Sequence, residues 1–299
     1  MTDFQLPIPP LFSFRECLWF LDRNYDDIMH RVTENSVIKP FRVGSQVTLV
    51  EISEQNQQLV IQYRGGDRVD TALLREQIVA LFDLEADLAP FYERLRTDPD
   101  LAHMVTEYYG LRLIGIPDLF EALCWSIIGQ QINLSFAYTL KRRLVELAGE
   151  KVAYQSHEFY GFPLPEHLAT LTVEQLRHLQ FSGRKAEYLI GVARAFAAGE
   201  ISKAQLLALS TAGDMVQKLI SLRGIGEWTA HYALMKSLKV PTSVPYGDVG
   251  LYNALSTLKR LPKRPSRAEL ASFFDPFEGF EAYLTLYLWR SLATPQSAS

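Results

Sequence analysis

The stretch "LRGIGEWTA", from Leu222 to Ala230, places two glycines one residue apart in a region whose apolar residues otherwise have helical spacing. Glycine reaches positive φ without steric cost and lets backbone N–H groups approach another molecule closely. Gly224, Ile225 and Gly226 therefore predict a tight hairpin between two helices, with Ile225 packed between them. The first N–H groups of the second helix have no intrahelical partner and lie at the positive end of its dipole, which suits an anion such as phosphate. An ordinary turn between two helices accounts for the same residues equally well.

Helical patterns extend from this hairpin in both directions. From Thr71 onward the strand signal vanishes, and segments with a period of 3.6 residues replace it. The expected helices cover residues 71–84, 88–97, 118–149, 172–180, 184–199, 202–210, 212–224, 227–239, 248–260 and 283–292. The fold class predicted is therefore mostly α.

The first part of the chain has a different pattern. Residues 14–23 have helical spacing, whereas residues 37–43, 45–53 and 58–65 alternate apolar and polar positions and are rich in Val and Ile. Residues 54–57, "EQNQ", form a plausible hairpin turn. We expect a small N-terminal α+β domain with an antiparallel sheet over residues 1–90, and a helical body over 91–299.

Charge is distributed unevenly between these parts. The net charge is −4, but residues 1–110 carry 10 Lys and Arg against 18 Asp and Glu, whereas residues 111–299 carry 20 against 16. The most basic segment is 201–268, which indicates a polyanionic partner for the C-terminal part or, alternatively, an unevenly charged surface. Two cysteines, Cys17 and Cys124, are too few for a disulfide framework, a four-thiolate zinc site or an iron–sulfur cluster.

The segment after the hairpin, "VPTSVPYGDVGLYNAL" (240–255), has two prolines and a glycine before Asp248. Aspartate is a favoured N-cap residue, so a structural role is the default interpretation. A carboxylate at a helix N-terminus is also favoured in its negative form by the dipole, which suits a group that stabilises a developing cation. Asp248 is thus a candidate both for capping and for catalysis.

These residues together resemble a known signature. "LRGIGEWTAHYALMKSL…VPYGDVGL" is similar to that of the helix-hairpin-helix DNA glycosylase superfamily, and most similar to its AlkA-type branch, the 3-methyladenine DNA glycosylase II enzymes. "DLFEALCWSIIGQQINLSFAYTL" (118–140) and "FDLEADLAPFYERL" (82–95) resemble two further stretches of that branch. The resemblance implies two helical lobes in the body with an active-site cleft between them.

The resemblance also implies roles for single residues. Asp248 falls on the essential catalytic aspartate of the superfamily. Members with lyase activity have a lysine two residues after the second glycine, and here that position is Trp228, which implies a glycosylase without lyase activity. Trp289 matches an aromatic residue that lines the base pocket of the branch, and Trp228 and Tyr232 lie one turn apart on one face of the helix after the hairpin. Electron-rich rings of this kind stack on a cationic base. Each of these rings also fits an ordinary core position.

Further roles concern the contact with DNA. Gln131, in "GQQ", falls on the residue that fills the gap left by a flipped base, although the best-known relatives have an apolar residue there. Gly224, Ile225, Gly226 and Thr229 would form the phosphate-binding hairpin. The backbone carbonyls of Ile220, Leu222 and Ile225 would hold a monovalent cation, the single structural metal that the resemblance suggests, and no other cofactor is expected.

The sequence as a whole therefore predicts a monofunctional DNA glycosylase that excises alkylated purines from damaged double-stranded DNA and leaves an abasic site. The alternatives are a glycosylase for oxidised or deaminated bases, or a non-enzymatic DNA-binding scaffold. "MTDFQLPIPP" does not read as a secretory signal, and no apolar run is long enough to span a bilayer, so we expect a monomeric cytoplasmic protein without membrane contact.

Overall fold

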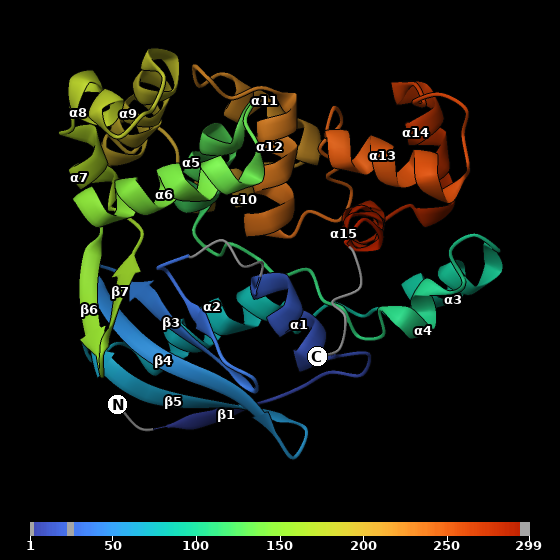
Figure 1. The fold of residues 1–299 in the computed structure, drawn as a ribbon, viewed down its shortest axis with the longest axis horizontal. Coiled ribbons are helices and arrows are strands. Elements are labelled where there is room, and N and C mark those ends of the chain that lie inside the picture. Colours follow the sequence, from blue (N-terminus) through green and yellow to red (C-terminus); the bar gives the residue numbers. More distant parts are fainter. Residues whose placement is uncertain (1–2, 23–26, 294–299) are drawn as a thin grey trace.

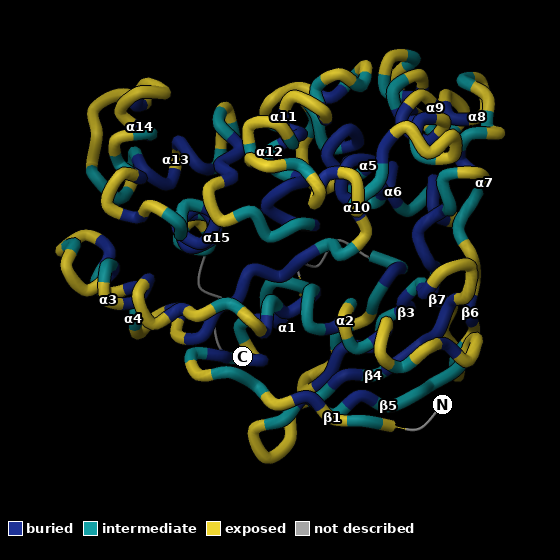
Figure 2. The backbone as a smooth tube through the Cα atoms, turned by 180° about the vertical axis from the view of Figure 1, so that it is seen from behind, coloured by how far each residue is buried: buried dark blue, intermediate teal, exposed yellow. Residues whose placement is uncertain are grey.

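The computed structural model describes residues 3–22 and 27–293. Its N-terminal part is a β-sheet with two helices, and a larger body of helices lies against it (Figure 1). Buried backbone is concentrated in the sheet and in the helices that meet at the centre, with exposed loops at the periphery (Figure 2). The fold is mostly helical with a small antiparallel sheet domain, as the sequence predicts.

The N-terminal domain is built on a five-stranded antiparallel sheet of order β1-β5-β4-β3-β2. The strands are β1 (Phe4–Pro7), β2 (Arg31–Val32), β3 (Ser36–Val43), β4 (Gln46–Gln55) and β5 (Gln58–Gly66), and the helices α1 (Phe14–Leu21) and α2 (Thr71–Phe82) pack on it. The turn predicted at 54–57 is confirmed, with Asn56 and Gln57 both at positive φ. The short edge strands β1 and β2 escape sequence prediction because alternation cannot be recognised over two to four residues.

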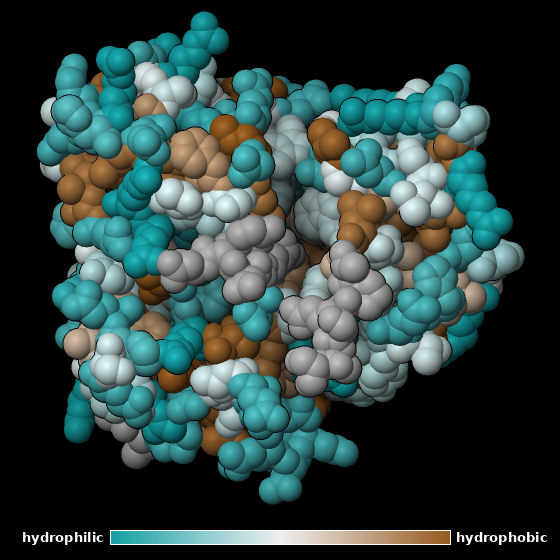
Figure 3. Space-filling view, viewed as in Figure 1, coloured by the Kyte–Doolittle hydropathy of each residue, from teal (hydrophilic) through white to brown (hydrophobic). Residues whose placement is uncertain are grey.

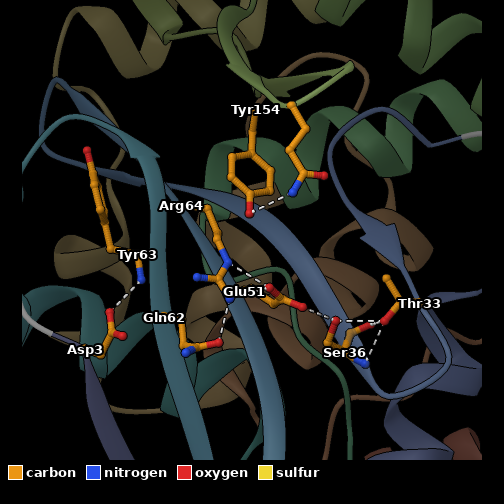
Figure 4. A network of polar contacts seen from close by, with 9 residues as sticks. Asp3, Thr33, Ser36, Glu51, Gln62, Tyr63, Arg64 and Tyr154 are labelled. Carbon is orange, nitrogen blue, oxygen red and sulfur yellow. Dashed lines mark hydrogen bonds and ion pairs between the residues drawn. The ribbon is translucent and has the colours of Figure 1, made fainter.

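One face of this sheet packs on the two helices, and the other face carries both a buried apolar cluster and a network of polar side chains (Figure 4). Val50, Ile52 and Ile61 point into the core shared with α1 and α2. On the opposite face the Arg64 guanidinium donates to Glu51 at 2.7 Å, and Glu51 also accepts from Ser36 Oγ at 2.6 Å. The alternation in the sequence thus corresponds in part to the two faces of the sheet, since Leu49 and Ile38 are buried on the second face.

The prediction that strands end at Thr71 is wrong. A second hairpin, β6 (Glu150–Tyr154) and β7 (His157–Gly161), leaves the helical body and packs on the N-terminal sheet. Val152 and Phe159 are buried there against Leu49. Each strand has only five residues and follows a long helical pattern, so its alternation is easily missed.

The helical body has two lobes with separate apolar cores. The first lobe contains α5 (Leu119–Gly129), α6 (Leu134–Ala148), α7 (Pro165–Ala169), α8 (Val173–His178), α9 (Gly183–Ala197), α10 (Lys203–Leu207), α11 (Ala212–Ile220), α12 (Glu227–Ala233) and a π-helical turn η1 (Leu234–Leu238). The second contains α3 (Ala89–Thr97), α4 (Met104–Glu107), α13 (Val249–Leu258), α14 (Arg267–Phe274), the 3₁₀ turn η2 (Asp275–Phe277) and α15 (Glu281–Ser291). The domain boundary at residue 90 stays a prediction, since Ile114 returns to the core of the sheet.

The single helix predicted over 118–149 is in fact two helices. α5 ends at Gly129, and Asn133 begins α6 by accepting a hydrogen bond from the Phe136 N–H at 2.8 Å. Gln131, between them, has a left-handed backbone with φ of 55°. An asparagine is a strong N-cap residue, so the break has a local cause in the sequence.

The surface shown in Figure 3 is mostly hydrophilic, with separate hydrophobic patches. Among the described residues, no helix is both long and apolar enough to cross a membrane.

Candidate active site

A cavity of about 500 Å³ lies where the two lobes and the N-terminal domain meet. Three helix faces of the first lobe line it: Glu121, Trp125 and Gly129 from α5; Leu134, Tyr138 and Lys141 from α6; and Trp228, Tyr232 and Lys236 from α12 and η1. The second lobe adds Asp248, Gly250 and Trp289, and the N-terminal domain adds Phe20, Leu21, Asp27, His30, Lys39 and Leu81. The spacing of three, four or eight residues within each set is that of one helix face.

Asp248 lies at the edge of this cavity as the N-cap of α13. Its Oδ1 accepts the Leu251 N–H at 2.8 Å and the Trp289 indole N–H at 2.9 Å. No described residue donates a hydrogen bond to Oδ2. One oxygen is therefore fixed by two donors while the other remains available to a bound molecule.

The three predicted pocket aromatics lie side by side. The rings of Trp228 and Tyr232 are stacked at 5.6 Å, and that of Trp289 lies 6.3 Å from Tyr232. All three are partly exposed and line the cavity. The structure thus places them in the wall next to Asp248 rather than in the interior of a lobe.

The hairpin at 224–226 joins α11 to α12. Gly224 has φ of +96°, and a Cβ there would lie 2.3 Å from the Tyr188 ring, so only glycine fits. Gly226 differs from Gly224: it has φ of −98°, and a Cβ there would meet nothing within 4 Å. No carbonyl of the described residues accepts from the backbone N–H groups of 226–229, which leaves these donors for an external anion.

The predicted hairpin residues differ in exposure. Ile225 is buried between the helices, as expected. Thr229 is only 1% exposed, and its hydroxyl accepts from Gln130 Nε2 at 3.1 Å. The Thr229 side chain is therefore not placed to touch phosphate, because Gln130 already occupies it; only the backbone N–H of Thr229 can contribute.

The "GQQ" segment lies at the rim of the cavity, between Gly129 and Leu134. Gln130 also donates to the Gly224 carbonyl at 3.1 Å, which ties this segment to the hairpin. Gln131 is exposed and has a left-handed backbone directly after the end of α5. The position of Gln131 beside the opening is compatible with the predicted wedge.

The three carbonyls proposed to bind a cation lie at the end of α11 and in the hairpin that follows it. The Leu222 carbonyl accepts the Ile225 N–H at 3.1 Å, which uses one of its two lone pairs. Ile220 ends α11 and Ile225 precedes α12. Among the described residues, no group of three or more His, Cys, Asp or Glu is arranged to hold a metal ion. A monovalent cation would be bound by backbone carbonyl oxygens and not by such side chains. The monovalent site therefore stays a prediction.

Several residues of the cavity were not anticipated from the sequence. Trp125 donates to the Tyr232 hydroxyl at 3.1 Å, and its ring lies 4.7 Å from that of Tyr138. Lys141 forms an ion pair with Asp27 at 2.9 Å. The helical spacing of these side chains in α5 and α6 was the available signal, but it does not reveal which face of a helix adjoins a cavity.

The charges at this end of the cavity shift one another's titration. Burial by itself raises the pKa of Asp27. The Lys141 ammonium and His30 lower it by more, so the pKa of Asp27 lies well below its usual range. Burial by itself lowers the pKa of Lys141. The negative charges of Asp27 and Glu121 outweigh this effect, so the pKa of Lys141 is raised. Burial lowers the pKa of His30. The carboxylate of Asp27 and the ammonium of Lys141 are thus both charged at neutral pH.

Comparisons with known proteins agree with this geometry. Residues 124–277 match the family model of the HhH-GPD superfamily of base excision DNA repair proteins, and residues 3–118 match that of the AlkA N-terminal domain. The chain is 39% identical over 292 residues to the DNA-3-methyladenine glycosylase of Bacillus subtilis, which covers 96% of each chain.

Two solved structures share the fold. A 3-methyladenine DNA glycosylase from Archaeoglobus fulgidus has a TM-score of 0.84 at 22% identity, over 97% of this chain and 99% of that one. A Schizosaccharomyces pombe 3-methyladenine DNA glycosylase, solved with abasic DNA, has a TM-score of 0.57 at 22% identity, over 71% and 100%. The chain belongs to the HhH-GPD superfamily of base excision DNA repair proteins, and within it to the AlkA-type DNA-3-methyladenine glycosylases.

Proposed function

We propose that this glycosylase hydrolyses the N-glycosidic bond of alkylated purines in double-stranded DNA, with Asp248 as the catalytic residue, and leaves an abasic site. The observation that carries the proposal is the Asp248 carboxylate, fixed through Oδ1 by Trp289 and Leu251 at the edge of an aromatic-walled cavity. A nucleotide must leave the base stack to enter such a cavity.

The aromatic wall supports a choice of cationic bases. The ring faces of Trp228, Tyr232 and Trp289 carry negative quadrupole potential, which favours a base that bears positive charge over a neutral one. Alkylation at a purine ring nitrogen creates such a charge. The base then leaves with the electron pair of the broken C1′–N bond, which neutralises it, so little acid catalysis is needed.

Asp248 acts on the sugar. As the C1′–N bond breaks, the sugar gains oxocarbenium character, and a carboxylate beside it stabilises that charge. Water adds to C1′ and loses a proton to Asp248 Oδ2 or to solvent. Because Trp289 and the α13 backbone hold Oδ1, Oδ2 faces the sugar without reorganisation.

The DNA is positioned by the hairpin and the rim. The N–H groups of 226–229 would bind a phosphate and set the register of the duplex without reading sequence. Gln131 would occupy the space that the flipped nucleotide leaves. Trp228 stands where lyase members have a lysine, so no amine forms a Schiff base, and Lys236 has its ammonium hydrogen-bonded to the Ile114 carbonyl.

Release of free base from methylated duplex DNA tests this proposal, with alkali-labile abasic sites as the readout. Asp248→Asn should lower the rate at least about 100-fold. Asparagine also caps helices well, so DNA binding should persist. Asp70→Asn is the matched control, because Asp70 caps α2 in the same way by accepting the Ala72 N–H.

The alternatives give different results. A protein that releases oxidised or deaminated bases but no methylated purine would contradict the substrate class. If the wild-type protein makes abasic sites and Asp248→Asn makes them equally fast, the assignment of Asp248 fails. Cleavage of the strand without alkali would contradict the absence of lyase activity.

A further inference from the structure

The cavity extends past its aromatic wall to a charged floor that the proposed mechanism does not use. This floor consists of Asp27, His30, Lys39, Glu121 and Lys141, all of which line the cavity. Glu121 lies one helical turn before Trp125 in α5, about 6 Å along the axis. Trp125 is hydrogen-bonded to Tyr232, so Glu121 lies one helical turn from a residue that contacts the aromatic wall.

The cations of this region are engaged with other groups. The Lys141 ammonium donates to Asp27 at 2.9 Å and lies 5.5 Å from the centre of the Trp125 ring. Lys39 Nζ lies 5.8 Å from the Phe41 ring, and Lys236 donates to the Ile114 carbonyl. The Lys141 ammonium is thus hydrogen-bonded to Asp27, whereas Glu121 attracts Lys141 and Lys39 electrostatically without a hydrogen bond to either.

Glu121 has a different environment. Its side chain is only 14% exposed, and its nearest cation is Lys141 Nζ at 3.9 Å, beyond hydrogen-bond distance. No described residue donates a hydrogen bond to it. A carboxylate has about four lone-pair sites, and leaving them unsatisfied in a largely buried place costs free energy unless a ligand supplies donors.

We propose that Glu121 is a specificity-determining residue, whose carboxylate accepts a hydrogen bond from the N–H-bearing edge of the flipped base and favours bases that carry positive charge. The proposal rests on the placement of that base against the aromatic wall described above. N–H groups of an alkylated purine are charged donors, and charge-assisted hydrogen bonds are roughly twice as strong as neutral ones. Two groups would then favour a positively charged base: the ring faces of the aromatic wall and the Glu121 carboxylate.

The test compares two lesions in one DNA duplex under single-turnover conditions with enzyme in excess. One lesion is a methylated, cationic purine, and the other is hypoxanthine, which is neutral. Glu121→Gln keeps the size of the side chain and removes its charge, and Glu121→Asp keeps the charge but shortens the reach. Glu146→Gln is the control on the neighbouring helix, because Glu146 is exposed and pairs only with Arg142 among the described residues.

We expect Glu121→Gln to lower the release of the methylated purine about tenfold, which corresponds to one charge-assisted contact. Hypoxanthine release should change less than about threefold. Glu121→Asp should fall between the wild type and Glu121→Gln, and Glu146→Gln should match the wild type. Equal thermal unfolding midpoints establish that the variants are folded.

An unchanged ratio of the two rates in Glu121→Gln overturns the inference, whether both rates fall together or neither changes. That result leaves the proposed function intact, since the wild type still releases the methylated purine. Failure of the wild type to release any methylated purine is the separate result that contradicts the proposed function.

Discussion

At the scale of single residues, the proposed catalytic carboxylate depends on two neighbours, Trp289 and Gly250, for its position. Trp289 donates its indole N–H to Asp248 Oδ1, and Gly250 leaves room for that arrangement. A Cβ at position 250 would lie 3.1 Å from Asp248 Oδ1, which is a tight contact, and 3.6 Å from Trp289 Cδ1, which is an ordinary one. A larger residue at position 250 would therefore shift the carboxylate by a few tenths of an ångström.

Trp289→Phe removes the indole donor and keeps an aromatic ring in the wall. We expect kcat to fall about tenfold, the worth of one hydrogen bond to a charged group, with little change in KM. Single-turnover kinetics on methylated DNA measure this. In the Asp248→Asn background the same change should add almost nothing, because the two residues act through one contact; additive losses would show that Trp289 works only by stacking.

At the scale of elements, the hairpin between α11 and α12 uses its two glycines for different reasons. Gly224 is fixed by its positive φ and by the Tyr188 ring, and is thus a requirement of the fold. Gly226 has an ordinary extended backbone and open space beside it, so the fold itself does not require a glycine there. We attribute its small size to the close approach of the DNA backbone. One glycine shapes the turn and the other keeps it accessible.

Alanine substitutions separate these two roles. Gly224→Ala should lower the free energy of unfolding by about 2–3 kcal/mol, because it combines a steric overlap with a strained left-handed residue. Gly226→Ala should leave stability within about 0.5 kcal/mol of the wild type and weaken binding to duplex DNA. Urea unfolding and fluorescence anisotropy with a duplex measure the two effects; equal loss of stability in both variants would contradict the division.

The sequence predicts the elements that have local signals and misses those defined by contacts far along the chain. The paired glycines, the proline-rich segment before Asp248 and the alternation in β3, β4 and β5 each indicate the element found. The split between α5 and α6 was also signalled by Asn133, yet the continuous apolar periodicity on both sides concealed it. The charged floor has no local signal, since it joins Asp27 to Lys141 over 114 positions.

At the scale of the whole molecule, the N-terminal domain is a wall of the active-site cavity and is joined to the helical body by buried charges. Asp27 accepts from Lys141 of α6, and both side chains are about nine-tenths buried. The β6–β7 hairpin makes a second, apolar connection to the sheet. The acidic domain is therefore placed to shape the pocket even if it stays off the DNA.

The ion pair predicts how stability depends on pH. Since the pKa of Asp27 is lowered in the folded state, the pair stabilises the protein fully above the unfolded pKa of about 4. This contribution declines as pH falls below that value and is lost as pH falls through the lower pKa of the folded state. Asp27→Asn should cost about 3 kcal/mol at pH 7, because it leaves the Lys141 ammonium buried without its partner. The difference from the wild type should shrink below about pH 4.

Urea unfolding at pH 7 and at pH 3.5 measures this difference. Glu146→Gln, which removes an exposed pair with Arg142, serves as the reference and should change stability by less than about 0.5 kcal/mol at either pH. A cost of Asp27→Asn that stays constant between the two pH values would mean that packing, and not charge, joins the domains.

The hydrogen bond from Trp289 to Asp248 has a consequence for the life of the polypeptide. The carboxylate emerges from the ribosome 41 residues before the indole that orients it, whereas the hairpin is complete earlier still. The carboxylate is thus fully oriented only after α15 has been synthesised and has packed beside α13. Efficient base release therefore depends on a segment made well after the proposed catalytic residue itself.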